Sequence, residues 1–450
     1  MHNNISRNLA FFATLAWLMP HPSLAALSAL GTLGGNLCMA IDVNNEGAAV
    51  GKCRTPAGDI VPTYWASGSS AAMALPGLEV DGPCSVVGIG GSNAVAGNCE
   101  LGADGERFPV RWLTPSLPSA VPQILNARTG HDRAEAQLMN QAGSVAGIST
   151  DPDGTDHPVL WKNGQTNATA LPVPGLLPPL LSPITDCHIT SMGHAATPAL
   201  VGYCDLRYGG TLAVKWTPNA IGGYNVASLP RIPGGSNCVA IAVNPNGYAA
   251  GTCEDTVGDL AAVRWNPSGG APAMLRGLPR EAAVGQQVFA ADMNSAGTIT
   301  GNYTATDGTT RSFVWAPTDD PDSEDGLDLG TPDGDTMRAE RIADNGYILG
   351  SALDAQGGNV AVLWTLATNL QTLGTLGGPY NRPVAISPNG AWIVGTSEIS
   401  TRNQHAYRVG SAQVGGTSKA KGFIGLAGAP IESNWCATLG KESTDCPDGF

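Results

Sequence analysis

The sequence predicts an all-β fold, an eight-bladed β-propeller of four-stranded antiparallel blades, with seven blades as the alternative. Two observations predict it: one unit of about 49 residues recurs along most of the chain, and each copy has turns at the same places. Such a period is typical of closed or stacked arrays, and propeller blades are four-stranded sheets. One glycine marks each copy: Gly51, Gly97, Gly147, Gly202, Gly251, Gly301, Gly350 and Gly395.

The clearest copy, residues 229–270, gives the expected order of strands in a blade. Residues 239–243 predict a first strand, because Val, Ala and Ile runs favour half-buried or buried strands. The turn sequence Asn-Pro-Asn-Gly follows, and then residues 248–254 and 260–265 predict the second and third strands. Residues 273–278 predict a shorter fourth strand, which completes an antiparallel meander.

An aromatic residue follows each marker glycine at a nearly constant distance. Large aromatics that recur at one structural position indicate core packed between blades. The last copy has Tyr407 in this role. The others have Trp65, Trp112, Trp161, Trp216, Trp265, Trp315 and Trp364.

The ring is expected to close by a strand from the other end of the chain. The last copy supplies three strands, within residues 384–409, and the pattern then stops without a fourth. Residues 27–33 match the strand that ends the preceding copies. Pairing them beside residues 404–408 covers an open sheet edge, which is otherwise an aggregation hazard.

The ten cysteines predict five disulfides. Eight of them occupy the same two places in four of the copies, and the other copies lack both members. Because a turn lies midway between the two places, the partners face each other across a hairpin. The predicted pairs are Cys38–Cys53, Cys84–Cys99, Cys187–Cys204, Cys238–Cys253 and, in the tail, Cys436–Cys446.

Residues 1–25 predict a secretory signal peptide, because an apolar run of signal length follows Arg7 and small residues precede Ala26. A retained N-terminal anchor is the alternative. The mature chain then divides into the propeller, residues 27–409, and a linker with a small disulfide loop, residues 410–450. The expected location is secreted or periplasmic.

The net charge of −14 disfavours nucleic acid and anionic membranes as partners, because both need a basic face. No segment after the signal reaches the length of a transmembrane helix, so membrane insertion is not expected. The expected partner is an extracellular protein or glycan.

The motif LGTLGG at residues 30–35 and 373–378, the Asn-x-x-Gly turns and the triplet His405-Ala-Tyr407 resemble the HAF-type extracellular repeat. The resemblance covers roughly residues 27–409 and is degraded in half of the copies. It implies an exported bacterial repeat protein, and it provides no established catalytic residues.

The insertion at residues 319–335 carries eight carboxylates, which predicts either a solvated loop or a Ca²⁺ site. Calcium is the only cofactor that the sequence suggests. The candidate ligands are Asp322, Glu324, Asp325 and Asp328.

Two other groups of polar residues could be metal sites, but a turn is the simpler interpretation of each. Residues 151–156 resemble part of a calcium loop, but Gly154 is the turn glycine of nearly every copy, which favours a hairpin turn. His188 and His194 lie six residues apart in an enlarged hairpin, where a variant turn is favoured over a metal site.

No catalytic motif stands out in the sequence. The first functional hypothesis is therefore a binding or interaction module that uses loops around one propeller face. The alternative is an extracellular glycan lyase or hydrolase with its site at the mouth of the channel.

Overall fold

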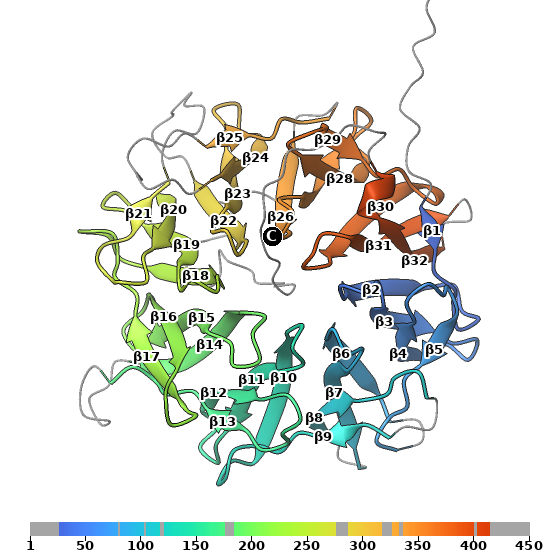
Figure 1. Cartoon of the computed structure of the whole chain (residues 1–450), viewed down its shortest axis with the longest axis horizontal. Coiled ribbons are helices and arrows are strands. Elements are labelled where there is room, and N and C mark those ends of the chain that lie inside the picture. The colour runs from blue at the N-terminus through green and yellow to red at the C-terminus, as the bar shows by residue number, and fades with distance from the viewer. Residues whose placement is uncertain are drawn as a thin grey trace, which may run out of the picture.

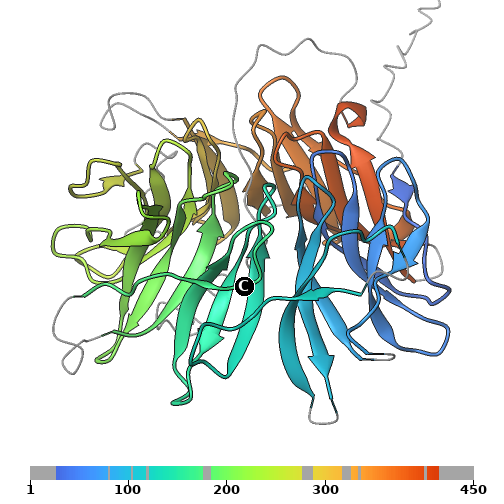
Figure 2. The same cartoon turned by 60° about the horizontal axis from the view of Figure 1, so that its bottom comes forward.

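The computed structural model describes residues 27–79, 82–102, 105–117, 121–175, 184–275, 287–316, 326–332, 336–399 and 403–414. Its strands form eight four-stranded sheets, which stand as blades around a central axis (Figure 1). Figure 2 shows the ring tilted, with the strands of each blade running between its two faces. The fold is the eight-bladed β-propeller that the sequence predicts, and the seven-bladed alternative is wrong.

Blades 1 to 4 follow one another along the chain, and each runs from the innermost strand to the outermost. Their strands are β2 (Cys38–Val43), β3 (Ala49–Arg54), β4 (Ile60–Trp65) and β5 (Ala72–Ala74); β6 (Cys84–Ile89), β7 (Val95–Leu101), β8 (Glu106–Trp112) and β9 (Gln123–Ile124); β10 (Arg133–Met139), β11 (Val145–Thr150), β12 (Asp156–Trp161) and β13 (Thr169–Ala170); and β14 (Ile184–Met192), β15 (Leu200–Leu206), β16 (Thr211–Pro218) and β17 (Tyr224–Ser228).

Blades 5 to 7 repeat this order, and blade 8 has three strands followed by the short 3₁₀ turn η2 (Ser411–Gln413). Their strands are β18 (Cys238–Val243), β19 (Ala249–Glu254), β20 (Leu260–Trp265) and β21 (Ala273–Met274); β22 (Val288–Met293), β23 (Ile299–Thr304), β24 (Thr310–Trp315) and β25 (Leu327–Asp328); β26 (Met337–Ile342), β27 (Ile348–Leu353), β28 (Asn359–Thr365) and β29 (Asn369–Thr372); and β30 (Gly377–Ile386), β31 (Trp392–Ile399) and β32 (Gln404–Gly410).

The N-terminal strand β1 (Ser28–Ala29) completes blade 8, which confirms the expected closure of the ring. Ser28 pairs with Arg408 and Ala29 with Tyr407 in an antiparallel register. The amide of Leu30 extends the pairing by donating to the carbonyl of Ala406 at 2.8 Å. The two ends of the propeller therefore share one sheet, and its outer edge is covered.

The innermost strand of every blade contains a bulge that the sequence analysis did not anticipate. In blade 1 the register of β2 against β3 shifts between Ala40 and Asp42. The bulge lets the Asp42 carboxylate accept the amide N–H of Ile89 in blade 2 at 2.9 Å. A bulge bends and twists its strand, and here it also supplies a contact to the next blade.

The tryptophans are buried between blades, as expected. The ring of Trp65 lies over Gly51, where a Cβ atom would also overlap with the carbonyl oxygen of Met39. The marker glycine is therefore required by this close approach. In blades 1 to 5 the indole N–H also reaches a carbonyl just after the last strand of the preceding blade, whereas the Trp315 indole N–H of blade 6 is buried without a partner among the described residues. The pairs are Trp65–Gly31, Trp112–Pro76, Trp161–Asn126, Trp216–Pro172 and Trp265–Pro230, at 2.7 to 2.9 Å.

Tyr407 does not occupy the tryptophan position of blade 8. It lies directly opposite Gly395, whereas Trp65 lies opposite a residue two places before its marker glycine. The phenol nevertheless covers Gly395. A different strand position therefore places an aromatic ring over the same glycine.

The structure contains four of the five predicted disulfides: Cys38–Cys53, Cys84–Cys99, Cys187–Cys204 and Cys238–Cys253. Each joins residues directly opposite each other on the first two strands of one blade. The pair Cys436–Cys446 lies outside the described residues, as do the predicted signal peptide and most of residues 410–450.

Candidate functional site

The two faces of the ring are built from different turns. The Asn-x-x-Gly turns connect the first and second strands of a blade and lie on one face. There Asn44 closes its own turn, because its Oδ1 accepts the amide of Ala48 at 2.9 Å. Its Nδ2 donates to the carbonyl of Gly90 in blade 2 at 3.0 Å. Asn140 and Asn244 make the same two kinds of contact with blades 4 and 6.

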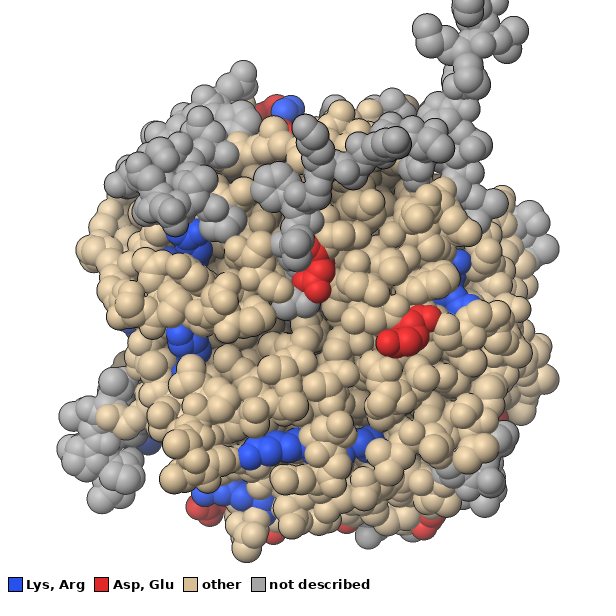
Figure 3. Space-filling view, in the orientation of Figure 1, with Lys and Arg blue, Asp and Glu red and all other residues tan. Residues whose placement is uncertain are grey.

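The opposite face carries the turns between second and third strands and the connections between blades. Its side chains differ from blade to blade, as expected where loops on a rigid scaffold carry function. Figure 3 looks on to one face of the ring, where charged side chains are few and several Lys and Arg side chains lie near one another towards the lower edge of the view.

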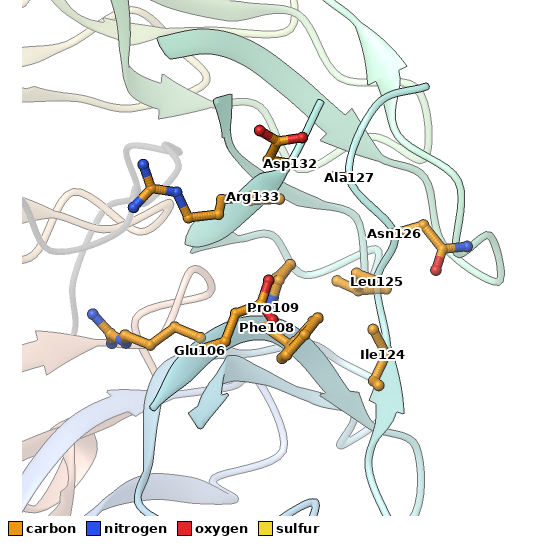
Figure 4. A pocket seen from close by; sticks show the side chains of 11 residues that line it. Glu106, Phe108, Pro109, Ile124, Leu125, Asn126, Ala127, Asp132 and Arg133 are labelled. Atoms are coloured by element: carbon orange, nitrogen blue, oxygen red, sulfur yellow. The ribbon is translucent and has the colours of Figure 1, made fainter. Parts of the chain in front are cut away.

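A pocket of about 110 Å³ lies between blades 2 and 3, on the face of the second-to-third-strand turns. Phe108 and Pro109 of β8 contribute apolar lining, and Ile124 to Ala127 form a wall (Figure 4). Asp132 and Arg133 lie where β10 begins, and the Arg133 side chain extends away from that wall. The pocket thus joins an apolar surface to charged groups.

Charged residues continue from the pocket across the blade interface. Arg107, which lines the pocket, forms an ion pair with Glu135 of β10 at 3.3 Å and also contacts the Ser85 hydroxyl at 3.4 Å. The sequence analysis did not single out these residues. No feature of the sequence distinguishes this interface, because the disulfide that blade 3 lacks, with Ala134 and Ser149 in place of two cysteines, is also missing from blades 6, 7 and 8.

Two histidines gather beside the turn at residues 151–156. His157 Nε2 lies 3.0 Å from the Asp151 carboxylate, and this bond is the main cause that lowers the pKa of Asp151. The His131 and His157 rings meet edge to face at 4.9 Å between centroids. Asp151 also accepts the amides of Asp153 and Thr155, so the segment is a closed hairpin turn, as the sequence predicts.

The two histidines of blade 4 are separated along one strand. His188 lies within β14, where its ring stacks on Tyr203 at 4.8 Å and its Nε2 lies 2.9 Å from the Asp205 carboxylate. His194 follows the end of β14, in the turn, and burial lowers its pKa to about 4. Because a strand rises about 3.3 Å per residue, the two rings do not share one site.

The predicted calcium ligands fall mainly outside the described residues. Asp322, Glu324 and Asp325 are not described, whereas Asp328 lies at the end of β25. The Asp328 carboxylate accepts the Tyr303 hydroxyl at 2.6 Å and lies 4.0 Å from Arg311. Within the described ranges, no three His, Cys, Asp or Glu side chains are grouped as metal ligands. A calcium site therefore remains a prediction.

None of the described helices is long and apolar enough to cross a membrane. The four disulfides indicate an oxidising compartment, because such bonds are rare where thiols are kept reduced.

No protein-family model matches the sequence, and no curated protein matches it. Among solved structures, the chain is similar to a puromycin hydrolase, at 14% identity and a TM-score of 0.50. The match covers 83% of this chain and 61% of the hydrolase chain, so this chain spans less than two thirds of that protein. An ulvan lyase matches at 9% identity and a TM-score of 0.41, over 86% of this chain and 95% of the lyase. A lectin from Aleuria aurantia matches at 10% identity and a TM-score of 0.33, over 78% of this chain and 96% of the lectin. At such identities, the likeness to the hydrolase shows a shared propeller fold and nothing about activity.

Proposed function

We propose that the protein is an exported binding module that holds one sugar residue of an extracellular glycan between blades 2 and 3. The observation that carries the proposal is the pocket there, whose lining includes the apolar side chains of Phe108 and Ile124 as well as Asp132 and Arg133. Ligand sites combine apolar lining with a few polar groups in this way.

The size and chemistry of the pocket favour a sugar residue over a larger free ligand. Pockets for drug-sized molecules measure roughly 300–1,000 Å³, so a space of about 110 Å³ suits one residue of a longer chain. A pyranose ring has an apolar C–H face, which packs on Phe108 and Pro109, and hydroxyls, which carboxylate and guanidinium groups can bind.

Export is part of the same proposal. The four disulfides and the signal-like N-terminus support it, as does the resemblance to HAF-type repeats of exported proteins. The ring closure and the contacts between turns make the scaffold rigid, which lowers the entropic cost of binding a ligand at its loops.

The experiment is a glycan-binding screen of the exported chain, followed by titration of each ligand against pocket variants. Phe108→Ala and Asp132→Ala should each weaken binding at least tenfold. Asp153→Asn, on the exposed turn of blade 3, is the matched control and should bind normally. Binding that all three variants retain would rule out this pocket, and a screen without any ligand would count against the function itself.

An extracellular lyase or hydrolase is the second candidate, and one constellation favours it. Asp205 accepts a hydrogen bond from His188 Nε2, so Nδ1 of the ring is the nitrogen able to act as a general base. Release of new reducing ends or of unsaturated sugars, lost in His188→Ala, would favour the enzyme. Binding without turnover favours the module.

A further inference from the structure

The imidazole rings of His131 and His157 meet in blade 3, with their centroids 4.9 Å apart and their planes at 67°. His157 lies on β12, directly opposite Ser149 of β11. His131 lies in the connection that leads into β10. Two segments that are separate in the sequence therefore bring two imidazole rings into contact beside the end of β11.

One nitrogen of the His157 ring is fixed by the turn between β11 and β12. Its Nε2 lies 3.0 Å from Oδ2 of Asp151. The other oxygen of that carboxylate accepts the amides of Asp153 and Thr155, at 3.0 and 2.9 Å, so the carboxylate is itself held in place. Because a carboxylate only accepts hydrogen bonds, the proton is on Nε2 and the lone pair of the ring is on Nδ1.

The His131 ring is fixed in the same way by a backbone carbonyl. Its Nδ1 lies 3.0 Å from the carbonyl oxygen of Ser149, which accepts the proton, so the lone pair of this ring is on Nε2. The connection that carries His131 is tied to β11 on both sides. The Arg128 amide donates to the Ser149 hydroxyl, and the Asp132 amide donates to the Thr150 carbonyl, both at 3.0 Å.

Metal-binding histidines have this arrangement, in which one nitrogen donates to a carboxylate or carbonyl and the other binds the ion. No hydrogen bond between described residues uses the lone-pair nitrogens, His131 Nε2 and His157 Nδ1. With metal–nitrogen bonds of about 2.0–2.1 Å, two imidazoles on one ion have ring centroids about 4.5–5 Å apart. The observed distance of 4.9 Å fits a shared ion.

We propose that His131 and His157 form a site for a divalent transition metal, which binds Cu²⁺ more tightly than Ni²⁺ or Zn²⁺. Within the described ranges, no third His, Cys, Asp or Glu side chain joins the pair as a ligand, so water or a bound molecule completes the coordination. The His157 side chain is 26% exposed, which lets an ion enter from solvent. Ca²⁺ does not suit the site, because it takes oxygen ligands. The site does not depend on the sugar pocket.

Blade 8 offers a matched control. His405 lies on β32 directly opposite Ser397, as His157 lies on β12 opposite Ser149. Each serine follows its marker glycine by two residues. Among the described residues, the ring contacts of histidine do not include His405. It is therefore a single imidazole at the strand position that His157 occupies in blade 3.

The first test is titration of the full exported chain with Cu²⁺, in excess Ca²⁺ so that sites made only of oxygen ligands are occupied. A single tight equivalent of Cu²⁺ should bind, and Ni²⁺ and Zn²⁺ should compete for it more weakly. Pulsed electron paramagnetic resonance at substoichiometric Cu²⁺ should show two coordinated imidazoles. This spectrum needs no variant, so it does not depend on how a variant folds. Coordination by one imidazole or by none would overturn the proposal.

The second test uses variants, each checked by its melting temperature without metal. His131→Gln and His157→Gln should each weaken Cu²⁺ binding at least tenfold and leave one imidazole in the spectrum. Asp151→Asn keeps an oxygen for the turn but turns its NH₂ towards His157 Nε2, which moves the ring proton to Nδ1. It should weaken binding about 10–100-fold, as the loss of such a partner does.

His405→Gln should bind Cu²⁺ like the unmodified chain. Normal binding by His131→Gln or His157→Gln would overturn the proposal and leave the two rings as a structural contact. Equal weakening in His405→Gln and His157→Gln would also overturn it, because the effect would then not depend on the pair.

Discussion

Asn45 and Asn389 lie 344 residues apart in the sequence and are joined by two hydrogen bonds. The Asn389 amide donates to Asn45 Oδ1 at 2.9 Å, and its side-chain nitrogen donates to the Asn45 carbonyl at 3.2 Å. The bonds connect the first turn of blade 8 with that of blade 1. Together with strand β1, they link the two ends of the propeller, so the ring should unfold as one cooperative structure.

Removal of residues 27–35 should destabilise the whole ring and promote association. The deletion removes β1, and with it the pairing to β32 and the carbonyl of Gly31 that Trp65 uses. It also exposes the edge of β32. Calorimetry and sedimentation would test this, with a chain lacking only residues 1–25 as the control. A truncated chain that stays monomeric with an unchanged melting temperature would be inconsistent with this closure.

Asn302→Ala should lower the free energy of unfolding by roughly 1–3 kcal/mol, because it leaves buried polar groups without partners. Asn302 donates to the carbonyl of Ala339 at 3.0 Å and accepts its amide at 2.8 Å. Asn225→Ala, in the exposed part of β17, is the control, and should change stability by less than about 0.5 kcal/mol. Denaturant titration measures the free energy of unfolding of both variants. Equal losses of stability in Asn302→Ala and Asn225→Ala would argue against a stabilising hydrogen bond between blades 6 and 7.

Protonation of His194 should destabilise the fold in acid. Its pKa is lowered to about 4 in the folded chain by burial, against the ordinary 6.5 expected on unfolding. The unfolded chain therefore binds the proton first, and stability falls as the pH drops from about 6.5 towards 4.

Between about pH 7.5 and pH 5, the free energy of unfolding should fall by roughly 2 kcal/mol more in the unmodified chain than in His194→Gln. Burial raises the pKa of Asp42 to about 6 and of Asp344 to about 7, which acts in the opposite direction in this range. Both acids are present in both chains, so the difference between the chains isolates His194. Parallel pH profiles would contradict the prediction.

Replacing Cys238 and Cys253 with alanine should lower stability by about 3 kcal/mol in the chain-entropy model of a short loop. The converse change is available in blade 3, where Ala134 and Ser149 lie directly opposite each other. Ala134→Cys with Ser149→Cys should form a fifth bridge within the ring. Peptide mapping without reductant would detect it, and two free thiols would show that the equivalence of the blades does not extend to this pair.

The architecture could be predicted because each blade repeats the same local signals. The marker glycines, the turn residues and the paired cysteines recur at positions set by strand register. The disulfide Cys38–Cys53 could therefore be predicted from the sequence alone. Residues 27–33, which match the last strand of a copy but precede the first copy, likewise predicted that the N-terminal strand closes the ring. The inner bulge could not be predicted, because the displaced residue, such as Ile41, has no distinctive sequence.

The candidate site depends on contacts between blades, which the repeat does not encode. Phe108 and Ile124 look like ordinary strand residues until blade 3 adds Asp132 and Arg133 to the lining of the same pocket. Tyr407 follows its marker glycine at nearly the spacing of the tryptophans, which predicts the tryptophan position. The register of β31 and β32 instead pairs Tyr407 directly with Gly395, so spacing alone does not give its place in the strand.

The central claim, that the pocket between blades 2 and 3 holds a sugar residue, is tested most directly by a crystal structure with an oligosaccharide from the binding screen. The account predicts electron density for one pyranose ring with its C–H face on Phe108 and Pro109, and with hydroxyls bonded to Asp132 or Arg133. An oligosaccharide bound elsewhere on the ring, with only water in this pocket, would contradict it.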